Sequence, residues 1–187
     1  MIRKRSWIVI GVGLVVGRFF IPPAYAQSPS SAPPVQAPDA AIRGVKMMET
    51  RQGERQWEVE ADKADILEDR GVAVLNKVVR PVRIVIYSGD ETLVSFAEKV
   101  IVDLKTKDLQ LIGQVQAESS KGTRIFSEVL HWSATRRELT TDDPVVVEKE
   151  GFQIKGKGMV ADTNLERMTF RERIASEVKL SPMKRRP

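Results

Sequence analysis

The residue types that carry most enzyme chemistry are scarce in this chain of 187 residues. There is no cysteine, which removes disulfides, thiolate zinc ligands and cysteine nucleophiles together. The single histidine, His131, follows a strand-like pattern beside Trp132. A metal site or a proton relay built on His131 would have to take its other members from carboxylates. A structural role is therefore the better interpretation of this histidine.

Two further motifs could do chemistry, and each has a simpler interpretation. Asp142-Asp143 could act as an acid and base pair, but adjacent acids ahead of Pro144 are typical of a turn. Gly156-Lys157-Gly158 could cradle a phosphate, yet no Walker pattern or strand-to-helix context surrounds it, and bulge or turn glycines explain it better. The sequence therefore predicts no catalytic residue, no metal site and no cofactor, and so no enzyme.

The formal charge of +5 is unevenly distributed. Four basic and no acidic residues fall in the first 26 positions, which leaves 26 basic against 25 acidic residues in the rest of the chain. A nearly neutral body lacks the basic surface that nucleic-acid binding requires, and the short cluster at 184–186 is typical of a solvated terminus. Nucleic acid is therefore not an expected partner.

The N-terminal segment has the composition of an export signal. A basic start is followed by an apolar run over 7–17, and Ala24-Tyr25-Ala26 fits a signal peptidase site. The alternative is a retained anchor, although the run is short for a membrane span. We expect residues 1–26 to be a signal peptide or membrane anchor, 27–41 a linker rich in proline, serine and alanine, 42–180 a β domain, and 181–187 a basic tail.

Residues from Ile42 onward alternate apolar and polar side chains with period two. The segments 57–61, 82–87, 109–117 and 124–132 are examples, and two to five turn-forming residues separate many of them. This pattern predicts an all-β domain of antiparallel hairpins.

The strands also repeat at longer range. Ala61, Ala97, Ser127 and Gly156 are each followed, after a charged turn, by a second strand at the same offset in four units. A repeat of about 30 residues that holds one hairpin cannot bury its apolar face alone, so the units must stack. We expect a bent, open sheet roll.

Alternation places one apolar row on the inside of such a roll. This row could line a channel for fatty chains, or it could be the dry core of a sandwich. Our candidates for lipid contact share an apolar side chain on the expected inner face: Trp57, Val59, Ile84, Ile86, Leu109, Leu111, Ile125, Val129, Val147, Phe152, Ile154, Met168 and Phe170. A slip of one residue would turn a whole strand's row outward.

Several segments together resemble the lipopolysaccharide export protein family LptC. They are the strand from Trp57 to Ala64, its partial copy over 95–99, Leu130-His131-Trp132, and the stretch from Thr140 to Asp162. The resemblance covers nearly the whole chain. It implies a twisted antiparallel β-jellyroll of the OstA-like kind, an open roll preceded by the N-terminal signal or anchor helix.

The resemblance also implies partners and a location. Proteins of this family are periplasmic, are associated with the inner membrane, bind lipopolysaccharide, receive it from an inner-membrane ABC transporter and pass it to an LptA-like bridge protein by edge-strand addition. The expected docking edges are Ile42–Thr50 and Phe170–Leu180, although charges such as Arg171 and Glu172 could instead cap the last edge. The alternative function is a structural β-rich envelope module with a closed core and no lipid cargo.

Overall fold

The computed structural model describes residues 38–178, and the expected leader, most of the expected linker and the basic tail lie outside this range. The all-β prediction is confirmed, because the described chain forms strands and one short 3-10 helix. Their bounds are β1 Ala40–Arg51, β2 Glu54–Leu67, η1 Glu68–Arg70, β3 Val72–Asn76, β4 Val82–Ser88, β5 Glu91–Ala97, β6 Lys99–Asp103, β7 Leu109–Ser119, β8 Arg124–Ser133, β9 Glu138–Lys149, β10 Phe152–Asp162 and β11 Met168–Val178.

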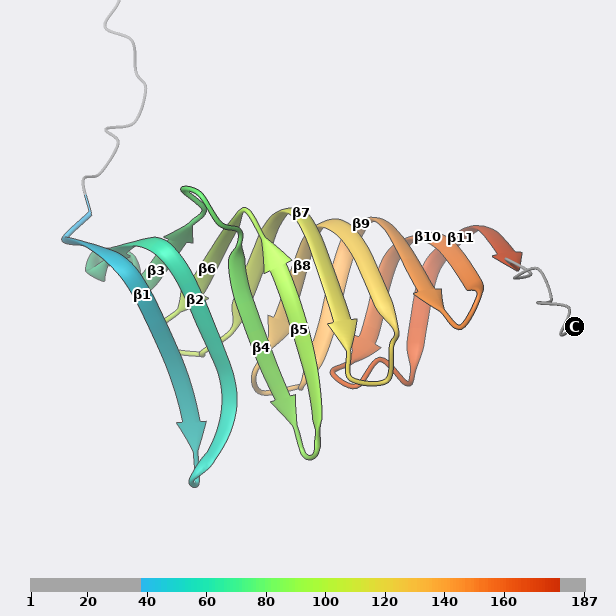
Figure 1. The fold of residues 1–187 in the computed structure, drawn as a ribbon, viewed down its shortest axis with the longest axis horizontal. Coiled ribbons are helices and arrows are strands. Elements are labelled where there is room, and N and C mark those ends of the chain that lie inside the picture. Colours follow the sequence, from blue (N-terminus) through green and yellow to red (C-terminus); the bar gives the residue numbers. More distant parts are fainter. Residues whose placement is uncertain (1–37, 179–187) are drawn as a thin grey trace, which may run out of the picture. The chain divides into compact units, whose positions relative to one another are not determined.

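The strands form one antiparallel sheet that closes on itself over part of its length. β2, β4, β5, β7, β6 and β3 pair in a ring, because β7 hydrogen-bonds to both β5 and β6 while β2 hydrogen-bonds to both β4 and β3. β1 adds to β2, and β8 to β11 continue the sheet from β7, so β1 and β11 are its two edges (Figure 1). The jellyroll expected from the sequence is confirmed.

The ring has two walls because β2 and β7 each change partner midway. In wall A, β4 and β5 lie between residues 57–60 of β2 and residues 116–119 of β7. In wall B, β3 and β6 lie between residues 63–67 of β2 and residues 109–112 of β7. Register shifts in the middle of the later ladders show where those strands bend from one wall to the other.

Asp62 fixes the corner at which β2 changes partner. Its Oδ2 atom accepts hydrogen bonds from the backbone N–H groups of Val78, Val79 and Arg80, at 3.3, 2.8 and 2.8 Å. These donors stabilise the carboxylate and lower the pKa of Asp62 to about 2. One side chain therefore anchors three backbone N–H groups of the loop that carries the chain from wall B to wall A.

The four hairpins that the repeat predicted are present, as β2–β3, β6–β7, β8–β9 and β10–β11. Their turns share local chemistry. Asp103, Ser133 and Asp162 occupy the same position before the turn, and each accepts a backbone hydrogen bond from within it. Lys107 and Arg137 then adopt positive φ, which such tight turns require.

Candidate functional site

Most of the predicted inner row lies where the alternation placed it. The following candidates are at most 3% exposed and belong to one continuous apolar cluster: Trp57, Val59, Ile84, Ile86, Leu109, Leu111, Ile125 and Val147. They come from five strands, and both walls contribute. The structure therefore brings these side chains together inside the roll, and their contact with lipid stays a prediction.

The remaining candidates lie at the margin of this row or outside it. Val129 is only half-buried, and Leu130 takes the inward position, because the ladder to β9 shifts between Ser127 and His131. Phe152 is 57% exposed at the start of β10 and does not join the row. Ile154 is half-buried. Met168 and Phe170 pack against the cluster but are only partly buried.

Sequence reasoning also missed part of the lining. The omitted residues are fully buried members of the same cluster: Leu75, Val82, Leu93, Val100, Val102, Val115, Leu130, Trp132, Leu139 and Met159. Several occupy short strands such as β5 and β6, where the same two-residue alternation was present over fewer positions. That alternation was the signal that could have found them.

The inner face of wall A is arranged in rungs. One rung runs from Trp57 through Ile86 and Leu93 to Ser119, and the next runs from Val59 through Ile84 and Ser95 to Ala117. Two polar atoms on these rungs, the indole Nε1 of Trp57 and Oγ of Ser95, are buried and have no hydrogen-bond partner within the described part of the chain. An unpaired buried polar group costs about 1–3 kcal/mol.

The interior is closed in this structure. Side chains of the two walls interdigitate so that Ile84, Leu111 and Ile125 have no exposed surface. A fatty chain could reach them only if the walls separate, since close-packed interiors leave no room for an added chain.

The turns of wall A and wall B face each other along a line that we call the seam. One arginine joins the two walls at this seam. Arg137, in the β8–β9 turn, donates from Nη1 to Oε1 of Gln56 at 3.1 Å and from Nη2 to the backbone oxygen of Tyr87 at 2.9 Å. We call these two hydrogen bonds of Arg137 the latch. Because Gln56 directly precedes Trp57, the latch lies beside the inner row.

Three ion pairs, made by two lysines, extend the seam. Lys107, in the β6–β7 turn, lies 3.8 Å from Glu49 of β1. Lys121, in the β7–β8 turn, pairs with Glu166 in the β10–β11 turn and with Glu91, and these hydrogen bonds raise the pKa of Lys121. The side chains in these ion pairs are partly exposed, so each pair stabilises the closed state only weakly and can exchange with water.

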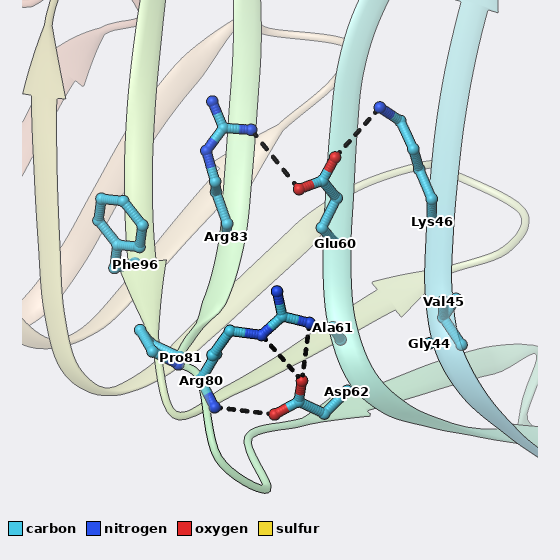
Figure 2. Close-up of a pocket in the computed structure, with 10 residues that line it drawn as sticks. All are labelled: Gly44, Val45, Lys46, Glu60, Ala61, Asp62, Arg80, Pro81, Arg83 and Phe96. Carbon is cyan, nitrogen blue, oxygen red and sulfur yellow. Dashed lines mark hydrogen bonds and ion pairs between the residues drawn. The ribbon is translucent and has the colours of Figure 1, made fainter.

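A hollow of about 450 Å³ lies on the outer face of the ring, not in its interior. Figure 2 shows Glu60 between Lys46 and Arg83, at 3.1 and 3.9 Å, and Arg80 against Asp62 at 3.2 Å. The charged groups drawn there pair with one another across β1, β2 and β4. The arrangement suits a brace between strands and is a poor site for an apolar ligand.

A second brace on that outer face is centred on Glu58, which is buried although it is charged. Its carboxylate contacts Lys46 at 3.0 Å, Arg55 at 2.9 Å and the hydroxyl of Tyr87 at 3.2 Å. The hydrogen bond from Lys46 is the largest cause of the lowered pKa of Glu58. β1 is thereby tied to β2 and β4.

Both edges of the sheet carry a long strand with one partner. Within residues 38–178, β1 pairs only with β2 and β11 pairs only with β10. Backbone groups on the outer side of each strand are available for strand addition. β1 contains the expected edge Ile42–Thr50, and β11 contains the expected second edge up to Val178, while residues 179–180 lie outside the described range.

The motifs that could do chemistry have structural positions. His131 is exposed on β8. Asp142 and Asp143 interrupt the β9–β10 ladder within β9 and do not form the turn we expected. Gly156 and Gly158 lie at register shifts of β10, as the bulge interpretation predicted, and a Cβ on Gly156 would lie 2.7 Å from Phe170. Among residues 38–178, no group of three acidic, histidine or cysteine side chains converges as metal ligands.

The fold and its lining define the class as an antiparallel β-jellyroll with a continuous aliphatic interior and two unpartnered edges. No helix in the described part of the chain is both long and apolar enough to span a membrane. The chain belongs to the LptC family, because the family model described as "Lipopolysaccharide-assembly, LptC-related" matches residues 7–177. That membership assigns the chain a role in lipopolysaccharide assembly, a transport function.

Among solved structures, the chain is similar to LptH, described as the LptA homologous periplasmic component of the conserved lipopolysaccharide transport device from Pseudomonas aeruginosa. The TM-score is 0.52 at 20% sequence identity, over 66% of this chain and 95% of that chain. At this identity the likeness supports the fold. No curated protein matches the chain.

Proposed function

We propose that this chain is a non-enzymatic periplasmic component of the lipopolysaccharide export bridge, associated with the inner membrane. It receives the lipid from the inner-membrane ABC transporter at the β1 edge and passes it to the next jellyroll subunit at the β11 edge. The observation that carries the proposal is the inward apolar row, which continues from β2 to Met168 and Phe170 of the last strand. Family membership supports the choice of lipid.

The row suits acyl chains because it is long and almost wholly aliphatic. Each methylene that leaves water contributes about 0.8 kcal/mol. The lining is more accessible at β11, where Met168 and Phe170 are only partly buried, than in the ring. We infer that cargo leaves by this end, because the apolar side chains of the last strand stay partly exposed until another strand covers them.

Photocrosslinking tests whether lipid occupies the interior. A photoreactive residue at Ile84 or Ile125, both inward, should capture lipopolysaccharide when the transporter is active. The same residue at Gln116, which is exposed on the outer face of β7, is the matched control. Equal capture at all three positions would indicate surface adhesion and would count against the proposal.

A second candidate function, a structural module without cargo, is favoured by the sealed packing of the ring. Locking the seam separates the two. Because the chain has no cysteine, Gln56→Cys with Arg137→Cys creates a unique pair. A short bismaleimide can join this pair, whereas a direct disulfide needs Cα atoms within about 7 Å.

The lipid carrier must open, so the crosslinked pair should lose lipopolysaccharide uptake while each single variant retains it. The matched control joins Lys46→Cys to Glu60→Cys, which are directly paired on β1 and β2 within one wall, and should leave uptake unchanged. Uptake that survives the 56–137 crosslink would favour the structural module or a surface-bound lipid.

A further inference from the structure

We propose that Ser95 and Trp57 form a polar contact point inside wall A that recognises an uncharged oxygen, a hydroxyl or an ester, on the acyl chain of the cargo. The inference deepens the proposed function and rests on it. It assigns two residues of the lining to oxygen atoms on the acyl chains of the cargo already proposed.

Both polar atoms lie within the apolar lining. Ser95 has no exposed surface and pairs across the sheet with Ile84 and Ala117, while Trp57 is 2% exposed and pairs with Ile86. Their strands are separated by one intervening strand, β4, and their rungs are adjacent, which puts the two Cα atoms about 12 Å apart. One inner surface therefore carries both groups.

The other buried groups of the same types show that these two are exceptional. Trp132 also lies in the cluster, but its Nε1 donates to Oγ1 of Thr163 at 3.2 Å. The hydroxyl of Ser119 accepts from the backbone of Thr123 at 3.2 Å. Nε1 of Trp57 and Oγ of Ser95 have no partner among the residues that the structure describes. Native interiors pair the large majority of such groups, so each unpaired one calls for an explanation.

The chemistry of the two groups limits what can satisfy them. An indole N–H only donates, so its partner must carry an acceptor oxygen, and the serine hydroxyl can donate or accept. A phosphate or carboxylate would bring a charge into an apolar interior at high cost. Hydroxyl and ester oxygens on a fatty chain meet both conditions, since they accept hydrogen bonds and are uncharged.

The test compares two probes of equal chain length, hydroxystearic acid and stearic acid, in binding to the full chain. One hydrogen bond to a neutral partner corresponds to roughly a threefold to tenfold difference in affinity. We expect the protein to prefer the hydroxylated probe by this factor. Ser95→Ala should remove the preference while it retains stearic acid binding, and Trp57→Phe should weaken the preference.

Ser120→Ala is the matched control, because Ser120 is exposed on the β7–β8 turn, and it should retain the preference. Stability gives a second readout. Ser95→Ala should leave the unliganded protein as stable as before or more stable, since it removes an unpaired group. Equal affinity of the unsubstituted protein for both probes, or a preference that survives in Ser95→Ala, overturns the inference and leaves the proposed function standing. Failure of both probes to bind, in a protein that still captures lipopolysaccharide at Ile84, overturns the inference alone, whereas loss of that capture as well overturns the proposed function.

Discussion

The latch at Arg137 can be tested by a pair of neighbouring substitutions. Arg137→Ala removes two hydrogen bonds that join the β8–β9 turn to Gln56 and to the backbone of Tyr87, at 3.1 and 2.9 Å. Arg136→Ala, one residue earlier, removes only a pair with Glu138 at 3.2 Å, in which the arginine side chain is 65% exposed. The two variants delete the same side chain from the same turn.

The expected difference follows from the number and exposure of these bonds. Each bond of Arg137 contributes about 1 kcal/mol, so Arg137→Ala should lower the free energy of unfolding by about 2 kcal/mol. Arg136→Ala should change it by at most about 0.5 kcal/mol. The loss of about 2 kcal/mol in Arg137→Ala corresponds to roughly a thirtyfold change in the ratio of folded to unfolded protein.

Urea denaturation of both variants gives the free energies, and the uptake rate of a fluorescent acyl probe reports on the seam. We expect Arg137→Ala to take up the probe faster, because the walls separate more easily, and Arg136→Ala to match the unsubstituted protein. Equal stabilities of the two variants would refute the latch. A destabilised Arg137→Ala with unchanged uptake would confine the latch to a structural role.

Three further outcomes follow from the packing and from the corner residues. Leu111→Ala should lower the free energy of unfolding by about 3 kcal/mol and the melting temperature by roughly 10 °C, because it leaves a cavity in a fully buried row. Asp62→Asn should flatten the loss of stability as pH falls from about 4 to about 2, because the folded-state pKa of Asp62 is about 2 against 3.8. The ionised Asp62 carboxylate stabilises the fold above that pH range, and protonation of Asp62 within the range removes this contribution. Gly113→Ala should destabilise the fold more than Gly122→Ala, because φ is positive at both glycines but only at Gly113 would the new Cβ lie 2.8 Å from the side chain of Glu98.

Each of these outcomes has a measurement that can contradict it. Thermal melts should compare Leu111→Ala with Gln110→Ala, which substitutes a half-buried neighbour. An equal fall in the melting temperatures of the two variants would argue against the packed row. Denaturation curves between about pH 4 and pH 2 test the role of Asp62. If Asp62→Asn loses stability as steeply as the unsubstituted protein, the Asp62 carboxylate does not stabilise this corner. Equal destabilisation by the two glycine variants would leave backbone strain as the whole effect.

Local pattern in the sequence was sufficient for the class and for much of the lining. A period of two residues is the period of a β-strand, so the alternation predicted strands. The repeated units predicted the four stacked hairpins. Trp57, Ile84 and Leu111 were placed correctly on the inner face for the same reason. The glycines at 156 and 158 were interpreted correctly because no other residue fits their bulges without strain or collision.

Only the tertiary structure decided how the strands bend and what holds the walls together. The register shift after Ser127 turns Leu130 inward in place of Val129, and a shift of this kind depends on the partner strand as much as on the strand itself. The latch joins Arg137 to Gln56 across 81 positions of the chain. Alternation is a property of neighbours in sequence, whereas a contact at this separation exists only after the sheet has closed.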